Sequence, residues 1–487
     1  MEDDRDGSSQ ATSLEVGAGA PQASVASKES RHSCLPHIPP PSRMPILRTV
    51  IGRSAQGAAE GLSPEAALHA RRNFRLGVVN GIMFTLVEAL IAPTLVLAYF
   101  ISGLGASNVL VGLLPAILSG GWFLPQILVA TRVQGLPRVM HWYRRVGILR
   151  TFCLVLLTIS TVALADEPTL LLAVFFLFFT IYAFSAGVTG IPWLEMVGKI
   201  VPPRRRGTFF GLRSFWGGLL ALAAAGPIGA ILSENLWGLT YPYNFAFLFG
   251  ITTIIVAVGV LAWSSIREPA ATSVAPAISV RALLKRGASV LRQDRDYRSF
   301  MIARILISLA TIADPFYVVY AKQALGAPAV TVGLYLGALA AASLLSNFLW
   351  SPLADRASNR LVMSLTVVAF AAVPFSALLL SFLKDVVDNG LLFTLFALVF
   401  ILSGLAVGAA RIVNNNMLLT IAPASERATY IGFLNLVLGI VIFVPVLGGV
   451  LVDFLGFTIL FVLSLALAAV GLAASLQMSA KRPTNQF

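Results

Sequence analysis

Two carboxylates stand inside long apolar segments, where an ionised side chain is costly. Glu88 lies about twelve residues into one segment, and a helix that rises about 1.5 Å per residue would place it near the middle of a ~30 Å apolar layer. Asp314 lies toward the outer end of a second segment. Burial favours the neutral form of a carboxylate, so either residue could take up a proton on one side and release it on the other. The alternative for Glu88 is a permanently protonated group that donates a hydrogen bond to a neighbouring helix.

Other polar side chains inside the segments form a second group, which we expect to line a substrate cavity. The group comprises Asn80, Gln126, Asn347, Arg411, Asn415 and Asn435. Arg411 and Asn415 are four residues apart and would share one helix face. The amides could instead join helices by hydrogen bonds, and Arg411 could extend to the membrane surface. For Arg150 and Arg304, which lie nearer segment ends, we expect extension to the surface.

A third group stands at the ends of segments and could form a gate on one side of the membrane. It comprises Asp355, Arg356, Arg360, Glu195, Arg206 and Arg427. Asp355 could accept hydrogen bonds from the free N–H groups at a neighbouring helix N-terminus, while Arg356 and Arg360 anchor to acidic groups or lipid phosphates. A solvated pair of Asp355 and Arg356 is the alternative. Glu195 and Lys199 have the i, i+4 spacing of a helical ion pair.

The residue types needed for an enzyme or a metal site do not gather in this sequence. All four histidines fall outside the apolar segments: His32, His37, His69 and His141. The stretch MVGKI around Lys199 lacks the Gly and the Ser or Thr of a phosphate-binding loop. No nucleophile stands beside a base at one depth, so we expect no enzymatic activity, no cofactor and no metal.

The composition indicates that membrane helices hold these side chains. Hydrophobic residues make up 57% of the 487, charged residues 12%, and the mean hydropathy is +0.83. Apolar runs near or above the roughly 18 residues needed to cross a bilayer predict twelve transmembrane helices, since open strands would leave backbone groups unsatisfied in lipid. Prolines inside the runs predict bending points at Pro93, Pro115, Pro192, Pro227, Pro315, Pro374 and Pro445.

An internal repeat divides the twelve helices into two halves. LGASNVLVGL, from Leu104, returns as LGAPAVTVGL from Leu325, with seven of ten positions identical and an offset of 221. PPRRRGTFFGL, from Pro202, matches PASERATYIGF from Pro423 at the same offset. Two matches at one offset indicate duplication. The expected fold is therefore an all-α integral membrane protein with two pseudo-symmetric six-helix halves, residues 74–266 and 299–478, joined by a linker, residues 267–298.

The ends of the chain and the connections predict its orientation. Residues 1–73 are rich in Ser, Ala, Gly and Pro and predict a disordered tail, or a start annotated upstream of a true start at Met44. At the end of this segment, LSPEAALHARRNFR, from Leu62, predicts a short helix on the membrane surface. Arginine and lysine gather in the even-numbered connections, whereas the odd ones carry only Lys322 and Lys384. By the positive-inside rule, we expect both termini, including the tail 479–487, to lie in the cytoplasm. The expected location of the protein is the plasma or inner membrane.

The two halves, the basic central loop and the segment SPLADRASNR resemble the major facilitator superfamily. Its loop pattern is a small residue, three further residues, Asp-Arg and, after a short gap, a basic residue; here Ser351 stands in the usual Gly place, followed by Asp355 and its neighbours. The matching loop between helices 2 and 3, LVATRVQGLPR, has no acid. The resemblance implies a secondary transporter that works by alternating access, with its site near the midplane between the halves.

The function hypothesis is proton-coupled transport of a small organic molecule. Export of an amphipathic compound is preferred to uptake of a sugar or an organic acid. The expected partners are a small-molecule substrate, protons and the lipid bilayer, and the protein is expected to be a monomer. No binding to nucleic acid is expected, because the net charge of +13 is explained by the basic residues on one side of the membrane. A rival is a non-transporting assembly or sensor protein on the same fold, which would tolerate loss of Glu88 and Asp314.

Topology provides the first prediction. A tag placed after Phe487 and a tag in the linker 267–298 should both be protected from an impermeant reagent in intact cells, since six helices per half return the chain to its starting side. Labelling of either tag from outside would contradict the twelve-helix arrangement.

Overall fold

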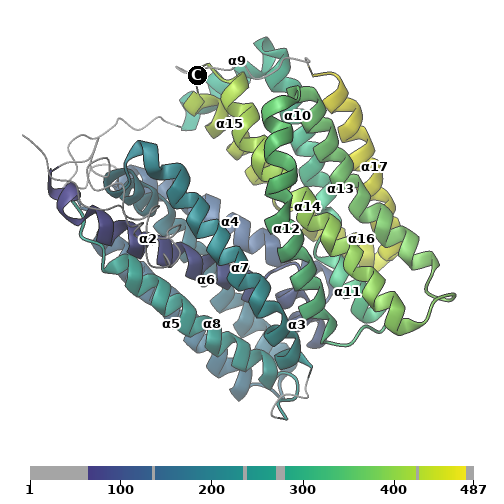
Figure 1. The fold of residues 1–487 in the computed structure, drawn as a ribbon. Coiled ribbons are helices and arrows are strands. Elements are labelled where there is room, and N and C mark those ends of the chain that lie inside the picture. The colour runs from purple at the N-terminus through teal and green to yellow at the C-terminus, as the bar shows by residue number, and fades with distance from the viewer. Residues whose placement is uncertain (1–63, 134–137, 234–237, 270–279, 424–426, 479–487) are drawn as a thin grey trace, which may run out of the picture. The chain divides into compact units, whose positions relative to one another are not determined.

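The computed structural model describes residues 64–133, 138–233, 238–269, 280–423 and 427–478. The chain divides into two units, residues 1–54 and 55–487, and the description below concerns the second unit. The expected tail up to residue 63, the middle of the linker and the last nine residues lie outside the described part. All regular secondary structure within the described ranges is helical, as Figure 1 shows.

The N-terminal half contains seven α-helices, namely α2 (Pro64–Leu90), α3 (Val96–Gly103), α4 (Asn108–Val133), α5 (Met140–Ala163), α6 (Pro168–Ile200), α7 (Arg206–Leu232) and α8 (Tyr243–Ser264). The linker contributes α9 (Val280–Gln293). The C-terminal half consists of α10 (Arg295–Ala310), the 3₁₀ turn η2 (Thr311–Ala313), α11 (Phe316–Gln323), α12 (Thr331–Arg356), α13 (Asn359–Phe382), α14 (Asn389–Ile421), α15 (Arg427–Val441), α16 (Val444–Leu455) and α17 (Phe457–Leu476).

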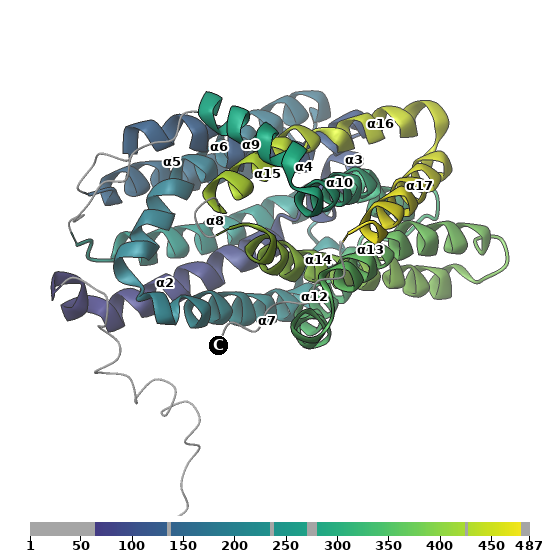
Figure 2. The ribbon, with the colours of Figure 1, turned by 90° about the horizontal axis from the view of Figure 1, so that it is seen from above.

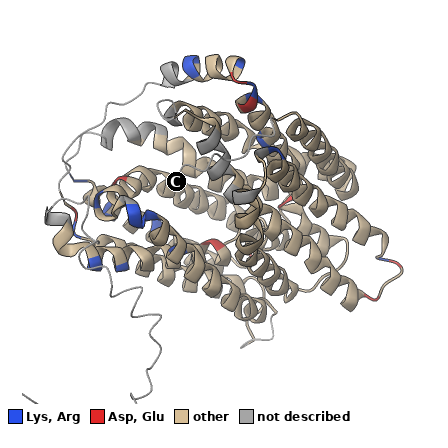
Figure 3. Cartoon of the chain, turned by 45° about the horizontal axis from the view of Figure 1, so that its top comes forward, with Lys and Arg blue, Asp and Glu red and all other residues tan. Residues whose placement is uncertain are grey.

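The membrane fold expected from the sequence is confirmed. Eleven stretches among the described residues are long and apolar enough to cross a membrane, two of them formed by consecutive helices, α10 with α11 and α15 with α16. The α2–α3 pair is not among these eleven stretches, and it corresponds to the first of the twelve crossings expected from the sequence. Charged side chains lie mainly toward the ends of the helices, as Figure 3 shows, which is the distribution that a lipid environment requires.

Three of the helices are interrupted beside a proline. The first is divided between α2 and α3 at Pro93, the seventh between η2 and α11 at Pro315, and the eleventh between α15 and α16 just before Pro445. Proline has no N–H to donate and its ring collides with the preceding turn, so a helix is weakened there. The other expected bending points, such as Pro192 and Pro374, lie within continuous helices.

The internal repeat is visible in the backbone. Gly105 and Gly326, from the two copies of the repeated LGA, have φ angles of 77° and 76°, a conformation that side chains with a Cβ rarely adopt. Helices α6 and α14 each contain 33 residues and begin 221 positions apart, at Pro168 and Asn389. The repeated segments therefore form equivalent turns and helices in the two halves.

The first helix begins earlier than the sequence suggested. Residues 64–73, expected to form a separate short helix, are the first turns of α2. A guanidinium N–H of Arg72 donates to the carbonyl of Ser265 at 2.9 Å, and the Asn73 amide donates to the carbonyl of Arg267 at 2.9 Å. These bonds attach the start of the first crossing to the end of the sixth.

Helix α9 packs onto the C-terminal half. Gly287 lies directly beneath the ring of Phe433 on α15, where any Cβ would collide. Asp294, after α9, caps α10 by accepting from the Tyr297 N–H at 3.0 Å, and it also accepts from the hydroxyl of Tyr430 at 3.0 Å. The linker helix is therefore bonded to α10 and α15.

The two halves meet along two helix pairs, α7 with α12 and α4 with α16, on opposite edges of the bundle in the view of Figure 2. We call the end of the bundle that carries α9 the basic end, and the opposite one the far end. Toward the basic end the two sets of helices diverge in Figure 1. At the far end, Gly333 of α12 packs against Gly229 of α7, and Gly449 of α16 against Asn108 of α4.

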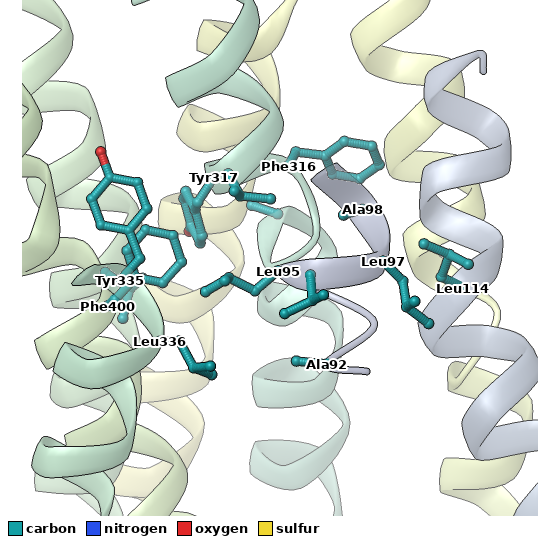
Figure 4. Close-up of a cluster of buried hydrophobic side chains, with 14 of the residues drawn as sticks. Ala92, Leu95, Leu97, Ala98, Leu114, Phe316, Tyr317, Tyr335, Leu336 and Phe400 are labelled. Carbon is teal, nitrogen blue, oxygen red and sulfur yellow. The ribbon is translucent and has the colours of Figure 1, made fainter. Parts of the chain in front are cut away.

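Polar contacts accompany this packing at the far end. The Lys322 ammonium donates to the Tyr99 carbonyl at 3.3 Å and lies 4.2 Å from the centre of its ring. The Asn108 amide donates to a carboxylate oxygen of Asp453 at 2.7 Å. Figure 4 shows a buried cluster in which side chains of the first crossing, such as Ala98, lie near Phe316 of the seventh. The far end is closed by contact between the halves.

The glycine contacts generate a prediction. Gly333→Ala places a Cβ 2.6 Å from the Ala225 carbonyl oxygen, so it should destabilise the closed far end by about 1–3 kcal/mol and lower the midpoint of thermal unfolding in detergent. Gly226→Ala on α7 is the matched control, since nothing lies within 4 Å of its added Cβ. Equal midpoints for the two variants would contradict the assignment.

Candidate functional site

Glu88 lies in the last turn of α2, directly before the break at Pro93. Its side chain is exposed, although it comes from the middle of a transmembrane crossing. Three guanidinium groups act on it electrostatically, first Arg411 of α14 and then Arg150 of α5 and Arg213 of α7. Because Arg411 belongs to the C-terminal half and Glu88 to the N-terminal half, the carboxylate lies where the two halves face each other.

Arg150 is held inside the N-terminal half by two aromatic rings. Its guanidinium carbon lies 4.6 Å from the ring centre of Phe84 on α2 and 4.4 Å from that of Tyr182 on α6, and it donates to the Tyr182 hydroxyl at 2.9 Å. Cation–π contacts of this kind stabilise a desolvated arginine. The expectation that Arg150 extends to the membrane surface is therefore wrong, because aromatic partners at its own depth stabilise the charge.

Arg213 lies against the backbone of α2. Its guanidinium donates to the Gly77 carbonyl at 2.7 Å and faces the rings of Trp193 and Phe209 at about 5 Å. Gly81 makes this approach possible, because a Cβ there would collide with the Arg213 side chain. A strong cation is thus fixed one helix away from Glu88.

Asn80 joins α2 to three other helices of the same half. It is 1% exposed, and its amide donates to the hydroxyl of Tyr143 on α5 at 3.3 Å and to the carbonyl of Gly259 on α8 at 3.0 Å. Its side-chain oxygen accepts from Arg213 at 3.4 Å. In this structure Asn80 makes the interhelical bonds that were the alternative to a cavity role.

Asp314 lines a cavity of about 670 Å³ between the two halves. The carboxylate stands at the interruption of the seventh crossing, just before Pro315, and is half-buried. Arg304 also lines this cavity, from α10, as does Asn435 from α15. Residues of α4 in the N-terminal half, such as Phe123, form another wall of this cavity. The geometry thus brings Asp314, Arg304 and Asn435 to one cavity.

The remaining expected cavity residues are scattered. Gln126 donates back to the Trp122 carbonyl of its own helix at 2.8 Å, and Asn347 is exposed on α12 with a bond to the Leu344 carbonyl at 3.4 Å. Arg411 is exposed on α14. The side chain of Asn415 lies outside the described residues.

An ion-pair cluster stands at the basic end. The Lys199 ammonium lies 2.9 Å from a carboxylate oxygen of Glu195 and 2.9 Å from one of Glu268. Glu268 follows the sixth crossing, and its side chain is 4% exposed. Its oxygens also accept from the backbone N–H groups of Val139 at 2.8 and 2.9 Å and of Met140 at 2.8 Å, which are free donors at the start of α5. Glu268 therefore both caps α5 and pairs with α6.

Sequence reasoning missed Glu268. It looked for an acid in the connection between helices 2 and 3, where the repeated loop pattern would put one, and found none. The carboxylate comes instead from the segment IREP after the sixth crossing. An acid directly after the sixth crossing, beside Arg267, was the available signal.

The other expected gate residues are less involved. Arg206 is exposed and donates at 3.4 Å to the carbonyls of Val201 and Gly198, and Arg360 is exposed. The side chains of Asp355, Arg356 and Arg427 lie outside the described part of the chain, so their gate role stays a prediction. In the searched ranges no three His, Cys, Asp or Glu side chains are grouped so as to hold a metal ion.

Comparisons with known proteins agree with this architecture. Residues 300–486 match the family model described as the Major Facilitator Superfamily. Similar solved structures include a D-xylose–proton symporter (14% identity, TM-score 0.59, 85% of this chain and 98% of that chain covered) and a variant of nucleoside transporter NupG (16%, 0.60, 83% and 99%). A variant of the peptide transporter POT is similar as well (14%, 0.60, 87% and 99%). No curated protein sequence matches the chain significantly.

The fold is therefore that of a multi-pass membrane protein, and it is similar to the fold of solved transporters. The chain is similar to the major facilitator superfamily: the family model matches residues 300–486, in the C-terminal half, and the likeness of fold extends over both halves.

The Glu268 cluster generates a prediction. Glu268→Gln keeps an acceptor but removes the charge that pairs with Lys199 and caps α5, so it should lower the free energy of unfolding by about 1–3 kcal/mol. Glu195→Gln is the matched comparison, because it removes one partner of Lys199 but leaves the cap of α5 intact. Thermal unfolding in detergent should rank Glu268→Gln below Glu195→Gln, and the reverse order would contradict the role of Glu268.

Proposed function

We propose that the chain couples proton movement to transport of a small organic solute by alternating access, with Glu88 as the proton-coupling group. The observation that carries the proposal is the position of Glu88, accessible at the break of the first crossing and under the influence of arginines from both halves. A carboxylate in this position can exchange protons, and its attraction to Arg411 of the other half depends on the distance between the halves.

The charged groups around Glu88 suggest how protonation would act. The positive charges of Arg411 on α14, Arg150 on α5 and Arg213 on α7 act on it electrostatically, and it acts in turn on the Tyr182 hydroxyl of α6. Ionised Glu88 attracts Arg411 across the interface, whereas protonated Glu88 does not. Loss of this attraction lowers the stability of the state in which the two residues are close, so proton binding changes the balance between access states.

The closed far end supports the assignment of an access state. Glycine contacts join α7 to α12 and α4 to α16 there, while the helices diverge toward the basic end. With the basic end in the cytoplasm, as the positive charges favour, this is an inward-facing state of a plasma-membrane or inner-membrane protein. Asp314, in its own cavity, is the reserve proton site.

The cavity also favours an amphipathic solute. It combines apolar side chains such as Leu438 and Ile442 with the polar groups of Arg304 and Asn435. Export of such a compound remains our preferred direction over uptake of a sugar.

Replacement of Glu88 tests the coupling. Glu88→Gln keeps the size and a donor but cannot titrate, so reconstituted protein should lose accumulation of substrate driven by a pH gradient while exchange of substrate without a gradient continues. The measurement is uptake into proteoliposomes under both conditions.

Glu167→Gln is the control, because Glu167 is exposed before α6, away from the interface between the halves. It should retain both activities. If Glu88→Gln still accumulates substrate when only a pH difference is imposed, Glu88 is not the coupling group.

A further inference from the structure

Arg304 has no protein partner for its charge in the described structure. It lies nine residues after the start of α10, roughly 14 Å along the helix axis, and its Nε is buried without a hydrogen-bond partner. No described carboxylate forms an ion pair with it, and Asp314 follows ten residues later, roughly 15 Å further along the axis. The expectation that Arg304 extends to the membrane surface is therefore wrong: it lines the cavity between the halves instead.

This isolation distinguishes Arg304 from Arg150 and Arg213. Arg150 is stacked on two aromatic rings, and Arg213 is bonded to a backbone carbonyl. A guanidinium cannot lose its proton under ordinary conditions, so an isolated one in a membrane interior is stabilised only by an anion or by polar solvent. Its planar fork matches a carboxylate or a phosphate with two parallel hydrogen bonds.

The rest of the cavity fits the body of an organic molecule. Apolar side chains from α15 and the start of α16 form one wall, and Phe123 of α4 faces them. Hydroxyl groups of Ser308 and Ser119 and the amide of Asn435 lie among them as neutral hydrogen-bonding groups. A volume of about 670 Å³ is within the range of small-molecule sites.

We propose that this cavity binds an amphipathic organic anion, whose carboxylate or phosphate pairs with Arg304 and whose apolar body lies between α4 and α15. The inference rests on the proposed transport function and names its substrate class. Asp314, at the other end of the cavity, would carry a proton when the anion is bound, since two negative charges in one apolar site repel each other.

Two anionic probes and one neutral probe, which share a naphthyl body, test the class of ligand. Purified protein should be stabilised against heat by 2-naphthoate and by naphthyl phosphate, and not by 2-naphthamide, because a ligand that binds the folded state raises its stability by mass action. Equal stabilisation by the naphthamide would overturn the proposal, as would absence of stabilisation by both anions.

Variants of Arg304 test the residue. Arg304→Gln should weaken binding of 2-naphthoate at least about tenfold, as expected for loss of a charge-assisted pair, and Arg304→Lys should recover part of the loss. Arg145→Gln, exposed on α5, is the matched control and should bind as the parent protein does. Unchanged binding to a folded Arg304→Gln protein would overturn the proposal, and so would equal losses in Arg304→Gln and Arg145→Gln.

Transport assays separate this inference from the function on which it rests. If 2-naphthoate binds in a manner that depends on Arg304 but is not taken up into proteoliposomes, the anion site is supported and the transport function is contradicted. If a neutral solute accumulates under a pH gradient but neither anion binds, the transport function is supported and the anion site is contradicted.

Discussion

The cost of a charge inside an apolar bundle constrains this structure more than any other interaction. Each arginine in the membrane interior of the N-terminal half is stabilised by a specific neighbour: Arg150 by Phe84 and Tyr182, and Arg213 by the carbonyl of Gly77. Such contacts fix the helices of this half relative to one another. Across the interface, by contrast, Glu88 and Arg411 interact only through space. The arrangement therefore favours motion between the halves over motion within them.

Much of the fold could be predicted because its determinants are local or repeated. The length of the apolar segments predicted the crossings, and a repeat at an offset of 221 predicted two related halves. In the structure Gly105 and Gly326, which are equivalent in the two copies of the repeat, both have the left-handed backbone conformation. The positions of Glu88 and Asp314 within their crossings also followed from counting residues. The partners of each side chain did not, because they depend on which helix face meets which neighbour. Arg150 and Glu268 illustrate the limit, since their partners lie 32 or more residues away in the sequence.

The comparisons show how little sequence the fold requires. Transporters for a sugar, nucleosides and peptides share this architecture at 14–16% identity. Helix packing in a membrane needs apolar surfaces and small residues at close contacts, and many sequences supply both. A few polar positions are then left to decide the substrate, and in this chain Arg304 and Asp314 occupy one cavity wall.

The docking of α9 has a mechanical consequence. Because Gly287 lies against Phe433 and Asp294 bonds to both Tyr297 and Tyr430, the linker helix and the C-terminal bundle form one rigid body. In a rocking motion α9 would be carried with that bundle, whereas Glu268 stays bonded to the N-terminal bundle through Val139 and Met140. Relative rotation of the two halves would therefore change the distance between Glu268 and α9.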